Sequence, residues 1–477
     1  MPSEALDSIT IQGFKSIKSI EKLPLTRINV LVGANGSGKS NFAGAFSFLH
    51  AIREARLQGY VRRAGGAEQV LHFGSKVSKE IRFRVSFRQD VNQYEIALQP
   101  TQDDSLYVAG EICGYRNKTL HSTPYIEGIQ PLNGGREAGI SDAALTGIPK
   151  WVRQRLGLFR MYHVHDTSSS SPMRKTSQVD DNAILKPDGA NLAAFLFLLQ
   201  EKHREEYELI RRTVQRVTPF FDNFLLRPDA LNEDTIRLAW KHRESDRYFG
   251  AAALSDGTLR FIALSTLFLQ PLKYRPAVIV IDEPGLGLHP LAITMLASLV
   301  KQAAVETQSI LSTQSTLLLD HFQPEDVLVA ERVDNGTQLT RVDSSQLAGW
   351  LEDYSLGQLW KKTNSVAAHK LTMPRLLVHV EAETEEAFVN EILKRRLLAC
   401  GYESVGARIV GNARQRDRRG GIRAWPGVKQ DILRHLTEPR VRTSMIGLQL
   451  SRLGVADSIR DALYSIRLTS VYSFAPR

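Results

Sequence analysis

The stretch that decides the fold is Gly33-Ala34-Asn35-Gly36-Ser37-Gly38-Lys39-Ser40, which lies between the largely apolar run Ile28 to Val32 and a segment with helical periodicity. Its glycines allow a sharp turn, so that successive backbone N–H groups and the N-terminal end of the following helix point at one anion. In loops of this kind the lysine reaches the β- and γ-phosphates of a nucleotide and the serine ligates Mg²⁺. Because the motif is preceded by a strand and followed by a helix, the sequence predicts a phosphate-binding loop rather than a chance glycine-rich turn.

Length and composition place limits on the class of protein. A chain of 477 residues predicts two or more domains. The two cysteines, Cys113 and Cys400, match no metal-ligand spacing, so we expect no disulfide framework or zinc site, and a reducing cytoplasm. No leader peptide is visible, and the longest apolar run, Leu192 to Leu199, is far short of the roughly 18 residues that span a bilayer. We therefore expect a soluble, cytoplasmic protein with no membrane partner.

Positive charge is concentrated towards the C-terminus. The chain has a formal net charge of +10, and residues 374–477 carry 18 lysines and arginines against 11 aspartates and glutamates. Such asymmetry predicts either an interaction with nucleic acid or simply a solvated basic surface.

The first half of the chain is rich in strand patterns. Apolar and polar residues alternate over Ser8 to Gln12 and over Ile81 to Phe87, and Tyr94 to Leu98 and Leu106 to Ile112 are further strand candidates. We interpret the last three as an antiparallel subdomain inserted after the first helix. Asn191 to Arg216 reads as helical, with no sustained heptad repeat that would indicate a long coiled coil.

Phe14 and Lys15 leave two interpretations open. An aromatic or basic residue this early in a nucleotide-binding fold can pack on the base. The alternative is that both are ordinary residues at the end of a strand.

The second half supplies carboxylates at the end of a strand. Ala277 to Ile281 is an apolar, β-branched run that ends in Asp282-Glu283, and the natural interpretation is a buried parallel strand. Ligands of open α/β sheets bind at the carboxyl ends of the strands, and two adjacent acids there are costly unless they hold a metal or a water. A neighbouring strand over Ser309 to Leu311 would place Gln314 beside these acids.

Two further patterns mark a helix start and a hairpin. Ser255 is a good N-cap for a helix that runs to about Leu269. A turn that contains Asn335-Gly336 predicts a hairpin. We divide the chain into an ATPase domain at 1–363 with an inserted subdomain at about 57–250, a linker at 364–372, and a C-terminal domain at 373–477.

Taken together, the motifs GANGSGKS, LSDGTLR, IVIDEP, GLGLHP and STQS occur in the order found in ABC-type ATPases. In detail they resemble AAA-family proteins related to the chromosome-maintenance and OLD (overcoming lysogenisation defect) ATPases, over roughly residues 1–360. The resemblance implies an α/β P-loop NTPase fold of ABC type, with an inserted antiparallel β subdomain and a helical lid. It implies ATP and Mg²⁺ as cofactors, ATP hydrolysis as the activity, and a homodimer that forms on ATP binding.

The resemblance also implies roles for individual residues. Lys39 holds phosphates, Ser40 and Asp282 serve Mg²⁺ directly or through a second shell, and Glu283 polarises the attacking water. Gln314 stands where many ABC ATPases carry a switch histidine, and an amide can still donate a hydrogen bond. The glutamine that usually links Mg²⁺ to the lid has no obvious counterpart. The nucleotide-binding residues are Gly33, Asn35, Gly36, Ser37, Gly38, Lys39, Ser40 and Asn41, and Ser255 and Gly257 match the signature that meets the γ-phosphate of the opposite subunit.

The C-terminal part resembles the opening of a Toprim-like domain. A strand over Arg375 to Val380 ends in Glu381, which we take as a metal-binding candidate, but Ala382 replaces the family's glycine and no paired-aspartate motif follows. Toprim chemistry needs a carboxylate cluster, so we expect a truncated or degenerate module. The arginines between Arg414 and Arg423 could grip phosphates or form a solvated loop.

These features favour an ATP-driven dimer switch that acts on DNA or on a nuclease partner. A place in phage defence or DNA repair is implied by the family resemblance alone. The alternatives are an ATP-regulated Toprim-type nuclease, against which the missing aspartates argue, and the motor subunit of an ABC transporter, against which LSDGTLR argues.

Overall fold

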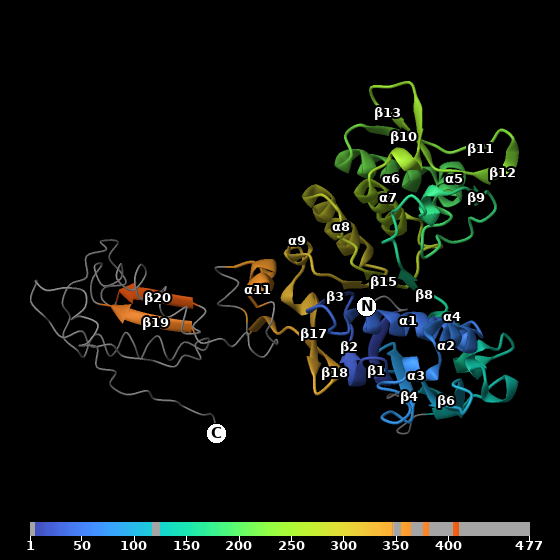
Figure 1. Cartoon of the computed structure of the whole chain (residues 1–477), viewed down its shortest axis with the longest axis vertical. Coiled ribbons are helices and arrows are strands. Elements are labelled where there is room, and N and C mark those ends of the chain that lie inside the picture. The colour runs from blue at the N-terminus through green and yellow to red at the C-terminus, as the bar shows by residue number, and fades with distance from the viewer. Residues whose placement is uncertain are drawn as a thin grey trace, which may run out of the picture. The chain divides into compact units, whose positions relative to one another are not determined.

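The computed structural model of the protein describes residues 5–116, 125–345, 347, 354–363, 375–380 and 404–409. The chain forms two compact units, Met1–Ala368 and His369–Arg477 (Figure 1). In the second unit the described residues form a parallel pair of strands, β19 (Arg375–Val380) and β20 (Ser404–Ile409). The strand predicted over Arg375 to Val380 is thereby confirmed. Glu381 and the arginines between Arg414 and Arg423 lie outside the described residues.

The phosphate loop belongs to a mainly parallel sheet. Its strands are β3 (Ile28–Val32), β8 (Phe159–Tyr162), β15 (Val278–Asp282), β16 (Gln308–Ser312), β17 (Val327–Val333) and β18 (Gly336–Arg341). They lie in the order β18-β17-β3-β16-β15-β8, and all neighbours are parallel except β17 and β18. β3 and β16 are buried along their whole length, as expected for strands that are covered on both faces. The strands predicted at 28–32 and 277–281 are therefore present.

The second sheet is antiparallel. Its strands are β1 (Leu6–Phe14), β2 (Ile17–Pro24), β4 (Ile81–Phe87), β5 (Asn92–Pro100), β6 (Leu106–Tyr115) and β7 (Tyr125–Gly128). Their order is β2-β1-β4-β5-β6-β7. The strands that we assigned to an insertion therefore share a sheet with β1 and β2, which precede the phosphate loop. Alternation identifies each strand but not its partner, because pairing is decided by contacts between distant segments.

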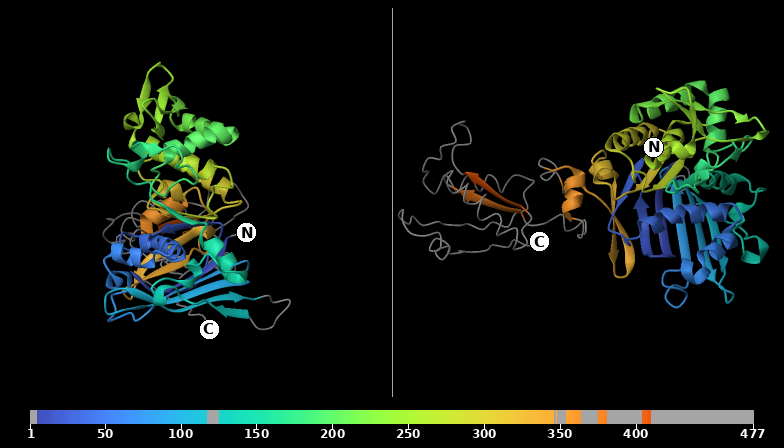
Figure 2. Two further views of the ribbon diagram at one scale, coloured as in Figure 1. Left: turned by 90° about the vertical axis from the view of Figure 1, so that its right-hand side faces the viewer. Right: turned by 45° about the horizontal axis from the view of Figure 1, so that its top comes forward.

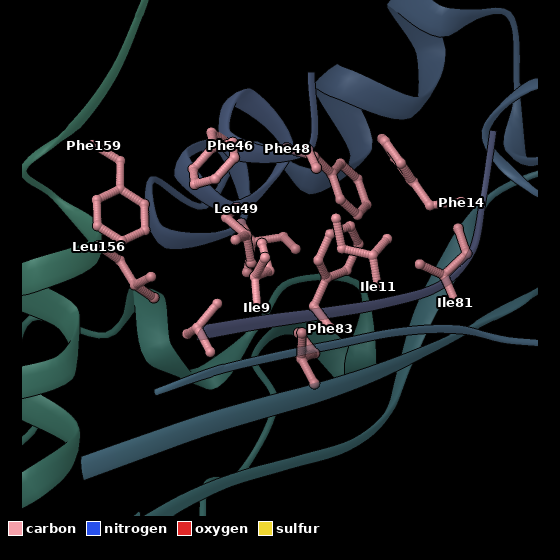
Figure 3. Packing of buried hydrophobic residues seen from close by; sticks show 14 of the residues in the cluster. Ile9, Ile11, Phe14, Phe46, Phe48, Leu49, Ile81, Phe83, Leu156 and Phe159 are labelled. Atoms are coloured by element: carbon pink, nitrogen blue, oxygen red, sulfur yellow. The ribbon is translucent and has the colours of Figure 1, made fainter. Parts of the chain in front are cut away.

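The two sheets share one hydrophobic core, and the helix after the phosphate loop contributes to it. Helix α1 (Lys39–Arg53) follows the phosphate loop, and its Phe48 packs against Phe14 of β1 and Phe83 of β4 (Figure 3), while its Phe46 packs against Phe159 of β8. Phe14 is fully buried there, with its ring 5.2 Å from that of Phe48 and 5.4 Å from that of Phe83. Phe14 is thus a core residue, and the interpretation that it packs on a nucleotide base is wrong.

A helical lobe lies on the other side of the parallel sheet from the antiparallel sheet (Figure 2). Its helices are α5 (Leu192–Lys202), α6 (Arg204–Val217), α7 (Asp256–Leu269) and α8 (Pro290–Ala303). The predicted helix over 191–216 is interrupted at His203, whose φ of −141° is not helical. Short strands complete the lobe: β9 (Ser177–Gln178), β10 (Phe221–Leu225), β11 (Pro228–Asp229), β12 (Asn232–Ile236), β13 (Ala239–His242) and β14 (Tyr248–Gly250).

The structure describes further α-helices. They are α2 (Leu57–Ala64), α3 (Ala67–Val70), α4 (Gly147–Leu156), α9 (Thr316–Leu319) and α11 (Leu356–Thr363). The hairpin of β17 and β18 is present as predicted, but its turn is Asp334-Asn335, since both residues have positive φ and Gly336 already pairs with Val333. Within the described part of the chain, no helix has the length and apolar character needed to cross a membrane.

Candidate nucleotide-binding site

The phosphate loop needs glycine at two positions for reasons that the structure makes explicit. At Gly38 the φ angle is +102°, and an added Cβ would lie 1.9 Å from the hydroxyl of Thr337. At Gly33 an added Cβ would lie 2.4 Å from the carbonyl oxygen of Ala330 on β17. The loop is therefore pressed against the β17–β18 hairpin, and it leads into the N-terminal end of α1, which is an electropositive helix terminus.

Lys39 is held inside the loop. Its ammonium group donates to the carbonyl oxygens of Gly33, at 2.7 Å, and Ala34, at 3.1 Å. Burial lowers the pKa of Lys39, while the carboxylates of Glu283 and Asp282 act in the opposite direction. A cation in this place can neutralise phosphate charge, which is the main demand that phosphoryl transfer makes of a protein.

Asp282 ends strand β15 and is bound by two hydroxyl groups. Ser40 donates to its Oδ2 atom at 3.0 Å, and Ser312, at the end of the neighbouring strand β16, donates to its Oδ1 atom. Ser40 and Asp282 lie 242 residues apart in the sequence, so the sheet brings together the two residues that we predicted to serve Mg²⁺.

Glu283 is set apart from Asp282 by an unusual backbone conformation. Its φ of +44° is rare for a residue with a side chain. The conformation is held by a hydrogen bond of 2.9 Å from the Glu283 N–H to the carbonyl oxygen of Ser312. Burial raises the pKa of the Glu283 carboxyl, against the effect of the hydrogen bonds from Gln314. The two adjacent acids thus occupy different environments.

Gln314 joins the acids to the phosphate loop. Its backbone N–H donates to Oε2 of Glu283 at 3.1 Å, and its side-chain amide donates to Oδ1 of Asn35 at 2.8 Å. The expectation that Gln314 lies beside the acids is confirmed. It follows from the parallel pairing of β15 with β16, which puts the ends of both strands at one edge of the sheet.

The donor groups at this edge suit Mg²⁺. Ser40 and Asp282 offer the hard oxygen ligands that Mg²⁺ prefers, and Mg²⁺ in nucleotide sites is held by one or two protein ligands together with phosphates and water. The hydroxyl of Ser37, in the same loop, is buried and has no hydrogen-bond partner in the part of the chain that the structure describes. Among the described residues there is no group of three or more His, Cys, Asp or Glu that could hold a metal ion by itself. Bound Mg²⁺ would supply charge neutralisation to the transferred phosphoryl group.

Asn41, which we predicted to bind nucleotide, makes its described contact elsewhere. Its side-chain amide donates to the hydroxyl of Ser16 at 2.7 Å, and Ser16 is hydrogen-bonded to Thr337 at 2.7 Å. These three side chains link the start of α1 to the β1–β2 turn and to strand β18. A role for Asn41 in binding nucleotide remains a prediction.

The signature residues begin helix α7. Ser255 is its N-cap, as predicted, and the Ser255 hydroxyl accepts a hydrogen bond of 3.2 Å from the N–H of Thr258. Gly257 lies so close to the loop after β15 that an added Cβ would be 2.5 Å from the carbonyl oxygen of Gly287. The residue types at both positions therefore have a local structural explanation, in addition to the role that we predict for them opposite a second subunit.

Two buried arginines that sequence reasoning missed fix the position of α7. Arg174 donates to the carbonyl oxygen of Leu254 at 3.1 Å and to the carboxylate of Asp256 at 2.8 Å. Arg260 donates to the carbonyl oxygens of Val164, at 2.9 Å, and of His165, at 2.8 Å. Arg260 is part of the LSDGTLR motif, which was the available signal. Nothing in the local sequence around Arg174 distinguishes it from an exposed arginine.

The segment after β8 runs close to Asp282. It contains His163 and His165 and no glutamine between Phe159 and Asp166. Burial lowers the pKa of His165, and the nearby carboxylate of Asp282 opposes that shift.

Comparison with known proteins indicates the same class of protein as the geometry of the site, a nucleotide-binding ATPase domain. Residues 28–121 and 158–320, more than half of the chain, match the family described as "AAA domain, putative AbiEii toxin, Type IV TA system". The chain belongs to this family. It is an AAA-type ATPase, and its topology is that of an α/β P-loop NTPase.

Similarity to chromosome-partition proteins accompanies the AAA domain. A stretch of 77 residues is 42% identical to the "Chromosome partition protein Smc" of Desulfitobacterium hafniense (strain Y51), and it covers 16% of this chain but only 6% of that relative. Among solved structures, an SmcHead bound to the C-winged helix domain of ScpA aligns with a TM-score of 0.48 and 16% identity, over 70% of this chain and 96% of that one. An Smc head domain with an extended coiled coil, derived from Pyrococcus furiosus and bound to the C-terminal domain of ScpA, aligns with a TM-score of 0.47 and 15% identity, over 74% of this chain and 99% of that one.

Proposed function

We propose that the protein is an ATP-hydrolysing switch in which two copies close around ATP and Mg²⁺, and that the switch acts on DNA or on a nuclease partner. The observation that carries the proposal is the meeting of Lys39, Asp282, Glu283 and Gln314 with the phosphate loop at one edge of the parallel sheet. Each of these groups has a distinct use in the hydrolysis of a phosphoanhydride.

The proposed chemistry assigns one task to each side chain. Lys39 neutralises phosphate charge, and Ser40 with Asp282 serves Mg²⁺. Glu283 orients the attacking water, because its carboxylate is half-buried and is held apart from Asp282 by its own backbone conformation. Gln314 senses the terminal phosphate with its side-chain amide, which lies between Glu283 and the loop. Catalysis then depends on positioning and electrostatics rather than on a covalent intermediate.

A second copy of the chain would complete the site. The first turn of α7, with Ser255 and Gly257, is an anion-binding helix terminus, and the hydrogen bonds described for these two residues stay within α7. In a two-fold dimer this turn would cover the γ-phosphate held by the other copy, so that ATP becomes part of a self-complementary interface. ATP would then stabilise the dimer by mass action, and hydrolysis would release it.

The finer assignments belong to the same proposal. We relate the chain to the OLD ATPases and assign residues 373–477 to a degenerate Toprim-like module with Glu381 as its remaining acid. We place the protein in the cytoplasm and its activity in phage defence or DNA repair. The family description includes a toxin of a type IV toxin–antitoxin system, which is compatible with action through a second protein.

Complementation between two inactive variants tests the composite site. Lys39→Ala removes the charge that binds phosphate, and Ser255→Arg places a bulky side chain in the shared interface. Each variant alone is expected to lack ATPase activity. A mixture should recover activity, because one site of a mixed dimer pairs an intact loop with an intact signature.

The control is the formation of mixed dimers, measured with two affinity tags, and ATP binding by the Ser255→Arg protein. If mixed dimers form and that protein binds ATP but no activity returns, the composite site is refuted. A Glu283→Gln protein that is no more dimeric with ATP than with ADP by light scattering would remove the nucleotide dependence of the dimer.

A further inference from the structure

The end of strand β16 contacts both acids of the site through one residue, Ser312. Its side chain is 1% exposed, and its hydroxyl donates to Oδ1 of Asp282. Its carbonyl oxygen accepts the hydrogen bond from the N–H of Glu283. The parallel register pairs Asp282 directly with Ser312, so both contacts follow from the sheet itself.

The two contacts act on different acids. The hydroxyl holds one oxygen of the Asp282 carboxylate, which leaves the other oxygen, Oδ2, facing the hydroxyl of Ser40. The carbonyl group holds the backbone of Glu283 in its left-handed conformation, and this contact does not depend on the side chain at position 312. Removing the hydroxyl therefore removes one of the two hydroxyl contacts described for the Asp282 carboxylate, and it leaves the backbone contact to Glu283 in place.

We propose that Ser312 is a positioning residue that fixes the orientation of the Asp282 carboxylate for Mg²⁺. Groups that hydrogen-bond to metal ligands typically change metal affinity by about 10- to 100-fold when they are removed. The inference rests on the proposed use of Ser40 and Asp282 for Mg²⁺. Ser312 is the first residue of the STQS motif, but the family resemblance gave it no role.

Strand β16 also contains a matched control. Ser309 is fully buried on the same strand, and its hydroxyl has no hydrogen-bond partner among the described residues. Ser309→Ala is thus the same chemical change in the same strand without the loss of a hydrogen bond. A second pair, Ser312→Thr and Ser312→Val, has nearly equal shape, so that the two variants differ mainly in the hydroxyl group.

The measurement is the Mg²⁺ dependence of nucleotide affinity, followed by titration of a fluorescent ATP analogue at a series of Mg²⁺ concentrations. We expect Ser312→Ala and Ser312→Val to raise the Mg²⁺ concentration at the midpoint by about 10-fold or more, from the usual effect of such partners. Ser309→Ala and Ser312→Thr should stay near the wild-type midpoint. ATP turnover by Ser312→Ala should recover at saturating Mg²⁺, which a general distortion of the site would prevent.

Two results overturn the inference, and they are distinguishable. If the wild-type protein gains no nucleotide affinity from Mg²⁺, the proposed function fails at Ser40 and Asp282 and the inference fails with it. If the wild-type protein responds to Mg²⁺ but Ser312→Val has the same midpoint as Ser312→Thr, the role of the hydroxyl alone is refuted. The comparison of Thr with Val remains decisive even where the alanine variant folds poorly.

Discussion

The substitution Glu283→Gln separates the binding of ATP from its hydrolysis. Glutamine has nearly the shape of glutamate, and its amide oxygen can still accept the hydrogen bond that the N–H of Gln314 gives to Glu283 at 3.1 Å. The backbone contact from Glu283 to Ser312 is also kept. The variant therefore loses the negative charge and the basicity of the side chain while the surrounding contacts stay in place.

The expected loss is in turnover. A positioned general base contributes about 10²-fold or more to the rate, which corresponds to roughly 3 kcal/mol in the activation barrier. ATP affinity should change little, because Lys39 and the loop provide the phosphate contacts. The assay combines equilibrium binding of a fluorescent ATP analogue with single-turnover release of phosphate. Glu201→Gln, an exposed glutamate on α5, is the control for the chemical change.

The pH dependence gives a second readout from the same protein. Burial raises the pKa of the Glu283 carboxyl above its ordinary value of 4.5. A general base works only when deprotonated, so wild-type activity should fall on acidification at a higher pH than for an ordinary glutamate. The residual activity of Glu283→Gln should lack this acid limb. A variant that turns over ATP at nearly the wild-type rate would remove Glu283 from the role.

Two further substitutions test the surroundings of the site. Gly38→Ala should lower both nucleotide affinity and the melting temperature, because a side chain at a φ of +102° and close to Thr337 costs about 1–3 kcal/mol of stability. Unchanged affinity and an unchanged melting temperature would contradict the tight contact of the loop with β18. Burial lowers the pKa of His50 to about 4. Between that pH and 6.5, His50 therefore binds fewer protons in the folded than in the unfolded state. Its contribution to stability is present above pH 6.5 and is lost on acidification. Chemical unfolding at pH 7 and pH 5 should therefore show a smaller loss of stability for His50→Asn than for the wild-type protein, and equal losses would count against the buried neutral imidazole.

Much of the fold could be predicted because its signals are local. The buried strands β3 and β15 are largely apolar runs, and α1 begins where the glycines of the loop end. The pairing of β1 with β4 could not be predicted in this way. Alternation specifies a strand with one buried face, whereas its partner is selected by the collapse of segments whose paired residues, from Leu6 with Phe87 to Gln12 with Arg82, lie 81 to 70 residues apart. Phe14 illustrates the limit, since an aromatic residue at a strand end can serve a ligand or a core.

The sequence by itself determined the chemical inventory of the site: a phosphate loop with Lys39 and Ser40, two acids at the end of an apolar strand, and a polar residue, Gln314, after another. Motif spacing can reveal these because each depends on residues that are neighbours along the chain. Only the tertiary structure decided how they are joined. Ser40 and Asp282 are 242 residues apart, Asn35 and Gln314 are 279 apart, and Ser312 reaches Asp282 across 30 residues. Side-chain hydrogen bonds at such separations depend on strand order and register, which arise from burial of the whole sheet and have no signature in a local pattern.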